Sequence, residues 1–160
     1  MAINELLEQL LRGAELVDAA VAGLSEGEAD YLPGNGKWTV RQVVSHLADS
    51  EMVGADRFRR VLAEDNPTLM AYDEKAWAEK LDWGRRSIPQ SLELFRKVRQ
   101  LNYELLKDLP EAAFERQGRH SERGPLRVAQ LLEIYAQHAE GHARQIRAAR
   151  ESYRQAQARG

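Results

Sequence analysis

The spacing of apolar residues constrains the fold of this chain more than any other feature. In the first segment, apolar side chains return at alternating steps of four and three residues, which places them along one face of a helix: Ile3, Leu7, Leu10, Ala14, Val17, Val21 and Leu24. Three later segments show the same spacing, and none shows the strict alternation of a half-exposed strand. The pattern predicts an all-α chain with helices near residues 2–23, 40–62, 88–108 and 126–155.

Two of these helices begin at recognisable capping sequences. Thr39 is followed three residues later by Gln42, and Ser87 is followed by Gln90. A hydroxyl at the helix start and an amide three residues on are typical of a capping box, in which each side chain satisfies a free backbone N–H. These signals place the start of the second and third helices.

The second and third helices are separated by a long connection, residues 63–87. It contains Tyr72, Trp77 and Trp83, and the segment Asp73–Leu81 is predicted to form a short helix. Connections of this length are often functional lids, although a packed excursion is the alternative. Four amphipathic helices with one long connection fit a four-helix bundle, which would form a single domain over residues 1–160.

The composition excludes several classes of function. The net charge is −2, which argues against a nucleic-acid partner. The chain contains no cysteine, so disulfides, zinc–thiolate sites and a cysteine nucleophile are excluded. Its acidic first segment does not fit a signal peptide, and it has no apolar run long enough for a membrane span. We expect a cytoplasmic location and no membrane partner.

Three of the four histidines lie on predicted inward faces. His138 and His142 are four residues apart on the apolar stripe of the last helix, so both imidazoles point in the same direction. His46 lies on or beside the inner stripe of the second helix. The three could bind one metal ion, or they could be hydrogen-bonded core or surface histidines. Ala139 follows His138, so the metalloprotease motif H-E-x-x-H is excluded.

Two segments carry a family resemblance. Trp38–Glu51, WTVRQVVSHLADSE, resembles the W-S/T-x-x-Q-x-x-x-H-L-x-D-x-E segment of the DinB/YfiT-like superfamily, and His138–Ile146, HAEGHARQI, resembles its H-x-x-x-H-x-x-Q-I segment. The resemblance implies an up-down-down-up four-helix bundle with a three-histidine metal site. The positions that match the family's ligands are His46, His138 and His142.

The resemblance leaves three functions open. The family includes metal-dependent hydrolases, and it includes S-transferases and an isomerase that use bacillithiol or mycothiol. We therefore expect a hydrolase, with a low-molecular-weight-thiol S-transferase and a non-catalytic metal-binding stress-response protein as alternatives. The cofactor would be a divalent zinc, nickel, iron or manganese ion. The expected partners are a small-molecule substrate, which could be such a thiol, and a second copy of the chain in a homodimer.

Several residues near the histidines are further candidates. Asp49 is predicted to be the catalytic residue, as a general base or a partner of a metal ligand, with a surface carboxylate as the alternative. Glu51 is expected to be solvated or to pair along its helix, and Trp38 to pack at the helix entrance. His120 is placed in a loop that could border the mouth of the site.

Arginines suggest two further features. Arg41 and Arg144 could bind the carboxylates of a thiol substrate at the mouth of the site. The arginines of the last helix, Arg150 among them, are interpreted as a solvated surface near the negative end of the helix dipole.

Overall fold

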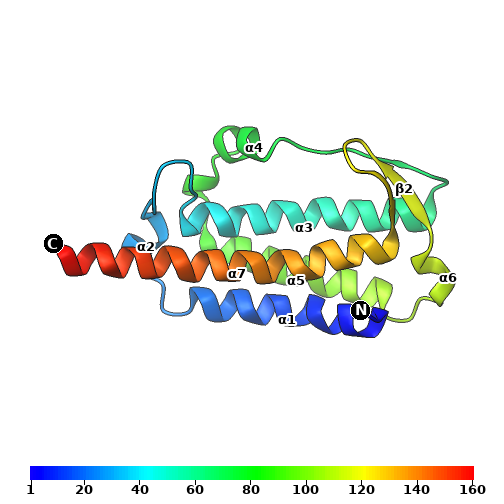
Figure 1. Cartoon of the computed structure of the whole chain (residues 1–160), viewed down its shortest axis with the longest axis horizontal. Coiled ribbons are helices and arrows are strands. Elements are labelled where there is room, and N and C mark those ends of the chain that lie inside the picture. The colour runs from blue at the N-terminus through cyan, green and yellow to red at the C-terminus, as the bar shows by residue number, and fades with distance from the viewer.

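The computed structural model describes residues 1–160 as a bundle of four long helices (Figure 1). They are α1 (Ile3–Val21), α3 (Val40–Ala63), α5 (Ile88–Leu106) and α7 (Val128–Arg159). Helices α1 and α7 run in one direction and α3 and α5 run in the other, so that the predicted up-down-down-up topology is confirmed. No helix is both long and apolar enough to cross a membrane.

The capping signals explain where the helices begin. The Thr39 hydroxyl accepts from the Gln42 N–H, and the Gln42 side chain accepts from the Thr39 N–H, so the capping box of α3 is complete. At α5, the Ser87 hydroxyl accepts from the Gln90 N–H, but no bond returns from the Gln90 side chain. The second predicted capping box is therefore only half formed.

The long connection contains the short helix that the sequence predicted. Helix α4 (Glu74–Lys80) begins after Asp73, whose side chain accepts from the Ala76 N–H. A 3-10 turn, η1 (Trp83–Arg85), follows and packs on α3. Figure 1 shows the connection returning along the bundle to the end at which α5 starts. Two further short helices are α2 (Glu26–Asp30) and α6 (Glu111–Phe114).

The absence of strands was predicted wrongly. Three short strands, β1 (Thr68–Leu69), β2 (Gln117–His120) and β3 (Gly124–Arg127), form one sheet in the order β1-β2-β3. Strand β1 pairs with β2 in parallel, and β2 pairs with β3 in antiparallel. Strands of two to four residues are too short to produce a visible alternation of polar and apolar residues. Consequently His120 lies in a strand rather than a loop, and α7 begins at Val128.

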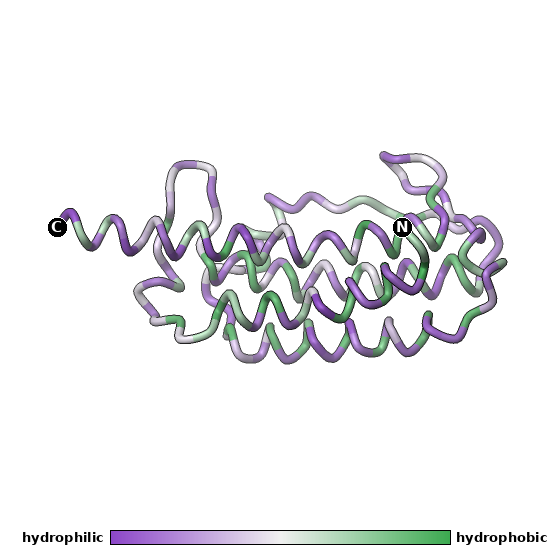
Figure 2. The backbone as a smooth tube through the Cα atoms, turned by 60° about the horizontal axis from the view of Figure 1, so that its bottom comes forward, coloured by the Kyte–Doolittle hydropathy of each residue, from purple (hydrophilic) through white to green (hydrophobic).

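The core consists of two apolar clusters along the bundle axis. Figure 2 shows apolar and polar stretches alternating along the long helices, as expected for helices with one apolar face. One cluster includes Leu10, Phe58 and Leu132, and the other includes Leu47 and Ile146. Between them along α3 and α7 lies a layer of polar side chains, of which His46, Asp49, Ser50 and Glu51 are buried and His138 is half-buried. The candidate site belongs to this layer.

Candidate metal centre

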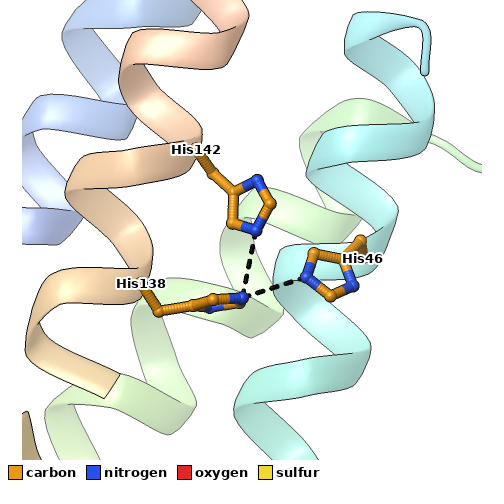
Figure 3. A group of neighbouring side chains, drawn as sticks. All are labelled: His46, His138 and His142. Atoms are coloured by element: carbon orange, nitrogen blue, oxygen red, sulfur yellow. Dashed lines mark hydrogen bonds between the residues drawn. The ribbon is translucent and has the colours of Figure 1, made fainter. Parts of the chain in front are cut away.

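Three histidines from two helices bring their ring nitrogens together inside the bundle. His46 projects from α3, and His138 and His142 project from successive turns of α7 (Figure 3). The His138 Nε2 atom lies 3.0 Å from Nε2 of His46 and 3.0 Å from Nε2 of His142. One ring nitrogen from each residue lies within 4.8 Å of the other two. The convergence predicted from the apolar stripes is therefore present.

Burial keeps these imidazoles uncharged. Desolvation, followed by the charge of His142, lowers the pKa of His46 to about 3. Desolvation, followed by the charges of His142 and His46, lowers the pKa of His138 to about 2. Desolvation also lowers the pKa of His142, against a hydrogen bond with Gln145. Near neutral pH the three rings thus carry the free lone pairs that metal ligation requires.

Gln145 fixes the tautomer of one ring. Its Oε1 lies 2.7 Å from the His142 Nδ1 atom, and an amide oxygen can only accept, so Nδ1 carries the proton. The His142 Nε2 atom is left with a lone pair directed at the cluster. Gln145 belongs to the H-x-x-x-H-x-x-Q-I segment, but no role was predicted for it. Its position three residues after His142, on the same side of the helix, is the signal that finds it.

The donor set fits a divalent metal ion. Imidazole nitrogens bind zinc at about 2.0–2.1 Å, and two nitrogens 3.0 Å apart can share one ion at that distance without moving. The Nδ1 atoms of His46 and His138 are buried and have no protein partner. Both rings therefore hold a nitrogen that the protein alone does not satisfy, beside an Nε2 that faces its neighbours. These residues could hold a metal ion.

Asp49 lies below the protein surface and does not belong to the ligand group. It is 3% exposed, so the alternative of a surface carboxylate is wrong. Its Oδ2 atom accepts from the Trp83 Nε1–H at 2.8 Å, and its Oδ1 atom accepts from the Arg86 guanidinium at 2.6 Å. The Trp83 ring lies 5.3 Å from that of His46. Asp49 thus positions an aromatic wall of the site.

The tryptophans were only partly anticipated. Trp38 packs at the start of α3, as expected, and its ring also lies 5.1 Å from the His46 ring and 5.3 Å from the Trp83 ring. No role was predicted for Trp83, because a tryptophan in a long connection carries no periodic signal. Both indoles pack against the His46 ring, and His46 is buried.

The expectation that Glu51 is solvated or pairs along its own helix was wrong. Glu51 is 0% exposed and Arg99 is 1% exposed. Arg99 donates to both carboxylate oxygens, at 3.1 and 2.9 Å, and to the carbonyls of Leu10 and Tyr135. Through these hydrogen bonds, Arg99 of α5 connects α1, α3 and α7.

One interpretation of the arginines was also wrong. Arg150 is buried, pairs with Glu28 and donates to two backbone carbonyls, so it does not belong to a solvated surface. Arg41 pairs with Asp30 and Glu26, so its charge is already neutralised. Arg144 is exposed on α7.

A cavity of about 280 Å³ opens beside His138. Its walls come from α3, the long connection, the β2–β3 hairpin and α7: Ser50, Arg57, Ala71, Tyr72, Glu74, His120, Glu122, Arg123, Leu126, Leu131, Ile134, Tyr135 and His138. His120 therefore borders the approach to the site, as predicted, and it is not a member of the ligand group. The volume is close to the lower limit for small-molecule sites.

The chain is similar to known proteins of one family. The model of the DinB superfamily matches residues 9–146. A protein of Oceanobacillus iheyensis named "Putative metal-dependent hydrolase" is 36% identical over 140 residues, which cover 88% of this chain and 81% of the relative. YfiT of Bacillus subtilis, named in the same way, is 35% identical over 124 residues, which cover 77% and 70%.

A solved structure is similar over most of its length. It is described as "YfiT from Bacillus subtilis is a probable metal-dependent hydrolase with an unusual four-helix bundle topology". The TM-score is 0.87 at 29% sequence identity, and the match covers 93% of this chain and 87% of the other.

Proposed function

The chain belongs to the DinB superfamily, and we propose that it is a metal-dependent hydrolase whose ion is bound by His46, His138 and His142. The observation that carries the proposal is the meeting of three uncharged imidazoles, one buried and two half-buried, next to a cavity. The names of the relatives support the same class of function.

The donor set favours a catalytic centre over a structural one. Structural zinc sites are usually closed by four ligands, whereas three neutral imidazoles leave a coordination position for water or substrate. When bound, the ion would supply Lewis acidity and would lower the pKa of a water molecule. Imidazole suits zinc, nickel and iron, whereas manganese is more often bound by oxygen ligands.

The surrounding residues would keep the ligands in place and exclude water. Gln145 holds the His142 ring by its Nδ1–H. Asp49 holds Trp83 against His46, so we assign Asp49 a positioning role in place of the predicted general base. Both oxygens of Asp49 already accept hydrogen bonds from the protein. We therefore expect the proton acceptor of the reaction to be a water molecule or a residue that lines the cavity.

Metal content tests the ligand assignment directly. We expect about one equivalent of divalent metal in the purified protein, and His142→Ala should lower metal affinity by at least about 100-fold, since it removes one of three ligands. His120→Asn is the matched control, because it alters the remaining histidine and should keep the metal. Equal metal content in all three proteins would refute the site.

Activity separates the hydrolase from its alternatives. The metal-loaded and chelated proteins should be screened against esters, amides and phosphoesters, and for transfer of an exogenous thiol. Metal-dependent hydrolysis supports the proposal. Thiol transfer alone would favour the S-transferase, and tight metal binding with neither activity would favour the non-catalytic protein. A cytoplasmic location and a homodimer stay predictions.

A further inference from the structure

The half-buried arginine at the cavity beside His138 has no carboxylate partner. Four other arginines of the chain are buried or half-buried, and each contacts a carboxylate: Arg41, Arg86, Arg99 and Arg150. Half-buried Arg57 instead donates to the Tyr135 hydroxyl at 3.3 Å and to the Met70 carbonyl at 2.8 Å. Its Nε atom is buried and has no partner.

Burying a guanidinium without a carboxylate is costly unless another anion satisfies it. Among the buried and half-buried arginines, Arg57 is the one that forms no ion pair with a carboxylate. The side chain lines the same cavity as His138, so a ligand bound there would meet both the arginine and the candidate metal centre. This location suggests that the missing counter-charge belongs to the ligand.

Two neutral donors face the same cavity. The His120 Nδ1 atom accepts from the backbone N–H groups of Glu122 and Arg123, at 3.2 and 3.3 Å, so the proton of the neutral ring is on Nε2. That Nε2–H has no hydrogen-bond partner in the protein. The Tyr135 oxygen accepts from Arg57, which leaves its hydroxyl proton free to donate. Burial raises the pKa of Tyr135 to about 12, so this hydroxyl keeps its proton near neutral pH.

The acidic residues at the cavity do not neutralise Arg57. Glu74 and Glu122 are exposed, and neither forms an ion pair with it. Exposed Arg123 lies near Glu74 and opposes the burial that raises the pKa of that carboxyl group. The cavity is thus lined by two glutamates and two arginines, and Arg57 is the one of these four that is half-buried rather than exposed.

We propose that the cavity binds the carboxylate of a small anionic substrate through the Arg57 guanidinium, the His120 Nε2–H and the Tyr135 hydroxyl. A planar carboxylate matches the two-pronged geometry of arginine. A single unpaired cation favours a monoanion over a phosphate dianion. The inference rests on the proposed function in that the other end of the substrate would reach the metal centre beside His138.

The binding of benzoate tests the proposal, with benzamide as its neutral isostere and phenyl phosphate as the dianion. Affinities are measured by NMR titration of both the metal-free and the zinc-loaded protein. We expect benzoate to shift the amide signals of the cavity residues and to bind at least about tenfold more tightly than benzamide. Equal affinity for benzoate and benzamide would overturn the proposal, and tighter binding of phenyl phosphate would overturn the choice of a carboxylate.

Variants locate the carboxylate. Arg57→Gln should weaken benzoate binding about tenfold or more, whereas Arg57→Lys keeps the charge but loses the planar fork, so it should weaken binding by a smaller factor. His120→Asn keeps an acceptor for the hairpin N–H groups and loses the Nε2–H, so it should weaken binding by a smaller factor. Arg147→Gln removes an exposed arginine from α7 and is the matched control. Unchanged affinity in folded Arg57→Gln would refute the assignment.

The two states of the protein separate this proposal from the proposed function. Benzoate binding that depends on Arg57 in the metal-free protein supports the anion site even if zinc fails to bind. Benzoate binding that occurs only with zinc and does not depend on Arg57 refutes the anion site while leaving the metal centre intact.

Discussion

Replacing Glu51 by leucine would leave the Arg99 guanidinium in the bundle without its counter-charge. The pair is 0% and 1% exposed, so water cannot solvate the remaining charge without opening the helices. Breaking a buried ion pair by removing one partner typically costs about 3–5 kcal/mol. We expect Glu51→Leu to lower the free energy of unfolding by an amount in this range, measured by urea denaturation followed by circular dichroism.

A double-mutant cycle distinguishes a lost pair from lost packing. Replacing both partners with apolar residues of similar volume is often close to neutral. Glu51→Leu combined with Arg99→Met should therefore cost at least about 2 kcal/mol less than the sum of the single substitutions. Additive costs would refute the reasoning, because they would mean that the two side chains act independently.

The pH dependence of the stability of Arg99→Met is a second test of the buried ion pair. Burial raises the pKa of Glu51, and Arg99 opposes that rise. Without Arg99, the buried carboxyl group should keep its proton at a pH at which the unfolded chain has lost it. The folded state then binds more protons, so the stability of Arg99→Met should fall as the pH rises above about 4.5. A cost that is the same at pH 5 and pH 7 would contradict this account.

Two further predictions concern the histidine cluster and its surroundings. Gln145→Leu should lower metal affinity by about 10–100-fold at unchanged helix content, because His142 loses the acceptor that fixes its tautomer; metal titration with a competing chelator measures the loss. The metal-free protein should lose stability as the pH falls from about 6.5 towards about 3, because the unfolded chain gains protons that buried His46 and His138 do not accept. Denaturation curves with a stability that is constant over this range would contradict the burial argument.

The long helices and the three histidines could be predicted from the sequence, because both depend on a repeating signal. The apolar residues of α1 return every three or four positions, and the same period places His138 and His142 on one face of α7. His46 also lies within the segment that resembles the family motif, Trp38–Glu51. The apolar period and the motif are both local features of the sequence, so they can be recognised without knowing how the helices pack.

The residues that support the site could not be predicted in this way. Trp83 lies in the 3-10 turn η1, and Arg57 lies on a half-buried side of α3. Their roles depend on contacts between segments that are distant in the sequence. The β2–β3 hairpin was missed because its strands are only four residues long. Its contribution to the cavity, through His120, is likewise a property of the tertiary fold.

The wrong interpretation of Glu51 and the surface alternative for Asp49 have one physical cause. An apolar stripe identifies a buried face only when the opposite face of the helix meets water. In α3, every residue from Val43 to Glu51 is buried, so that two turns have no exposed face. Helices α5 and α7 pack against α3, and η1 of the long connection covers a further side. Because α3 and α5 are parallel, the chain must return along the bundle, and that return brings Trp83 over Asp49 and next to His46. The connection that this topology requires therefore buries Asp49, a polar residue that a pattern of one buried and one exposed helix face would assign to the surface.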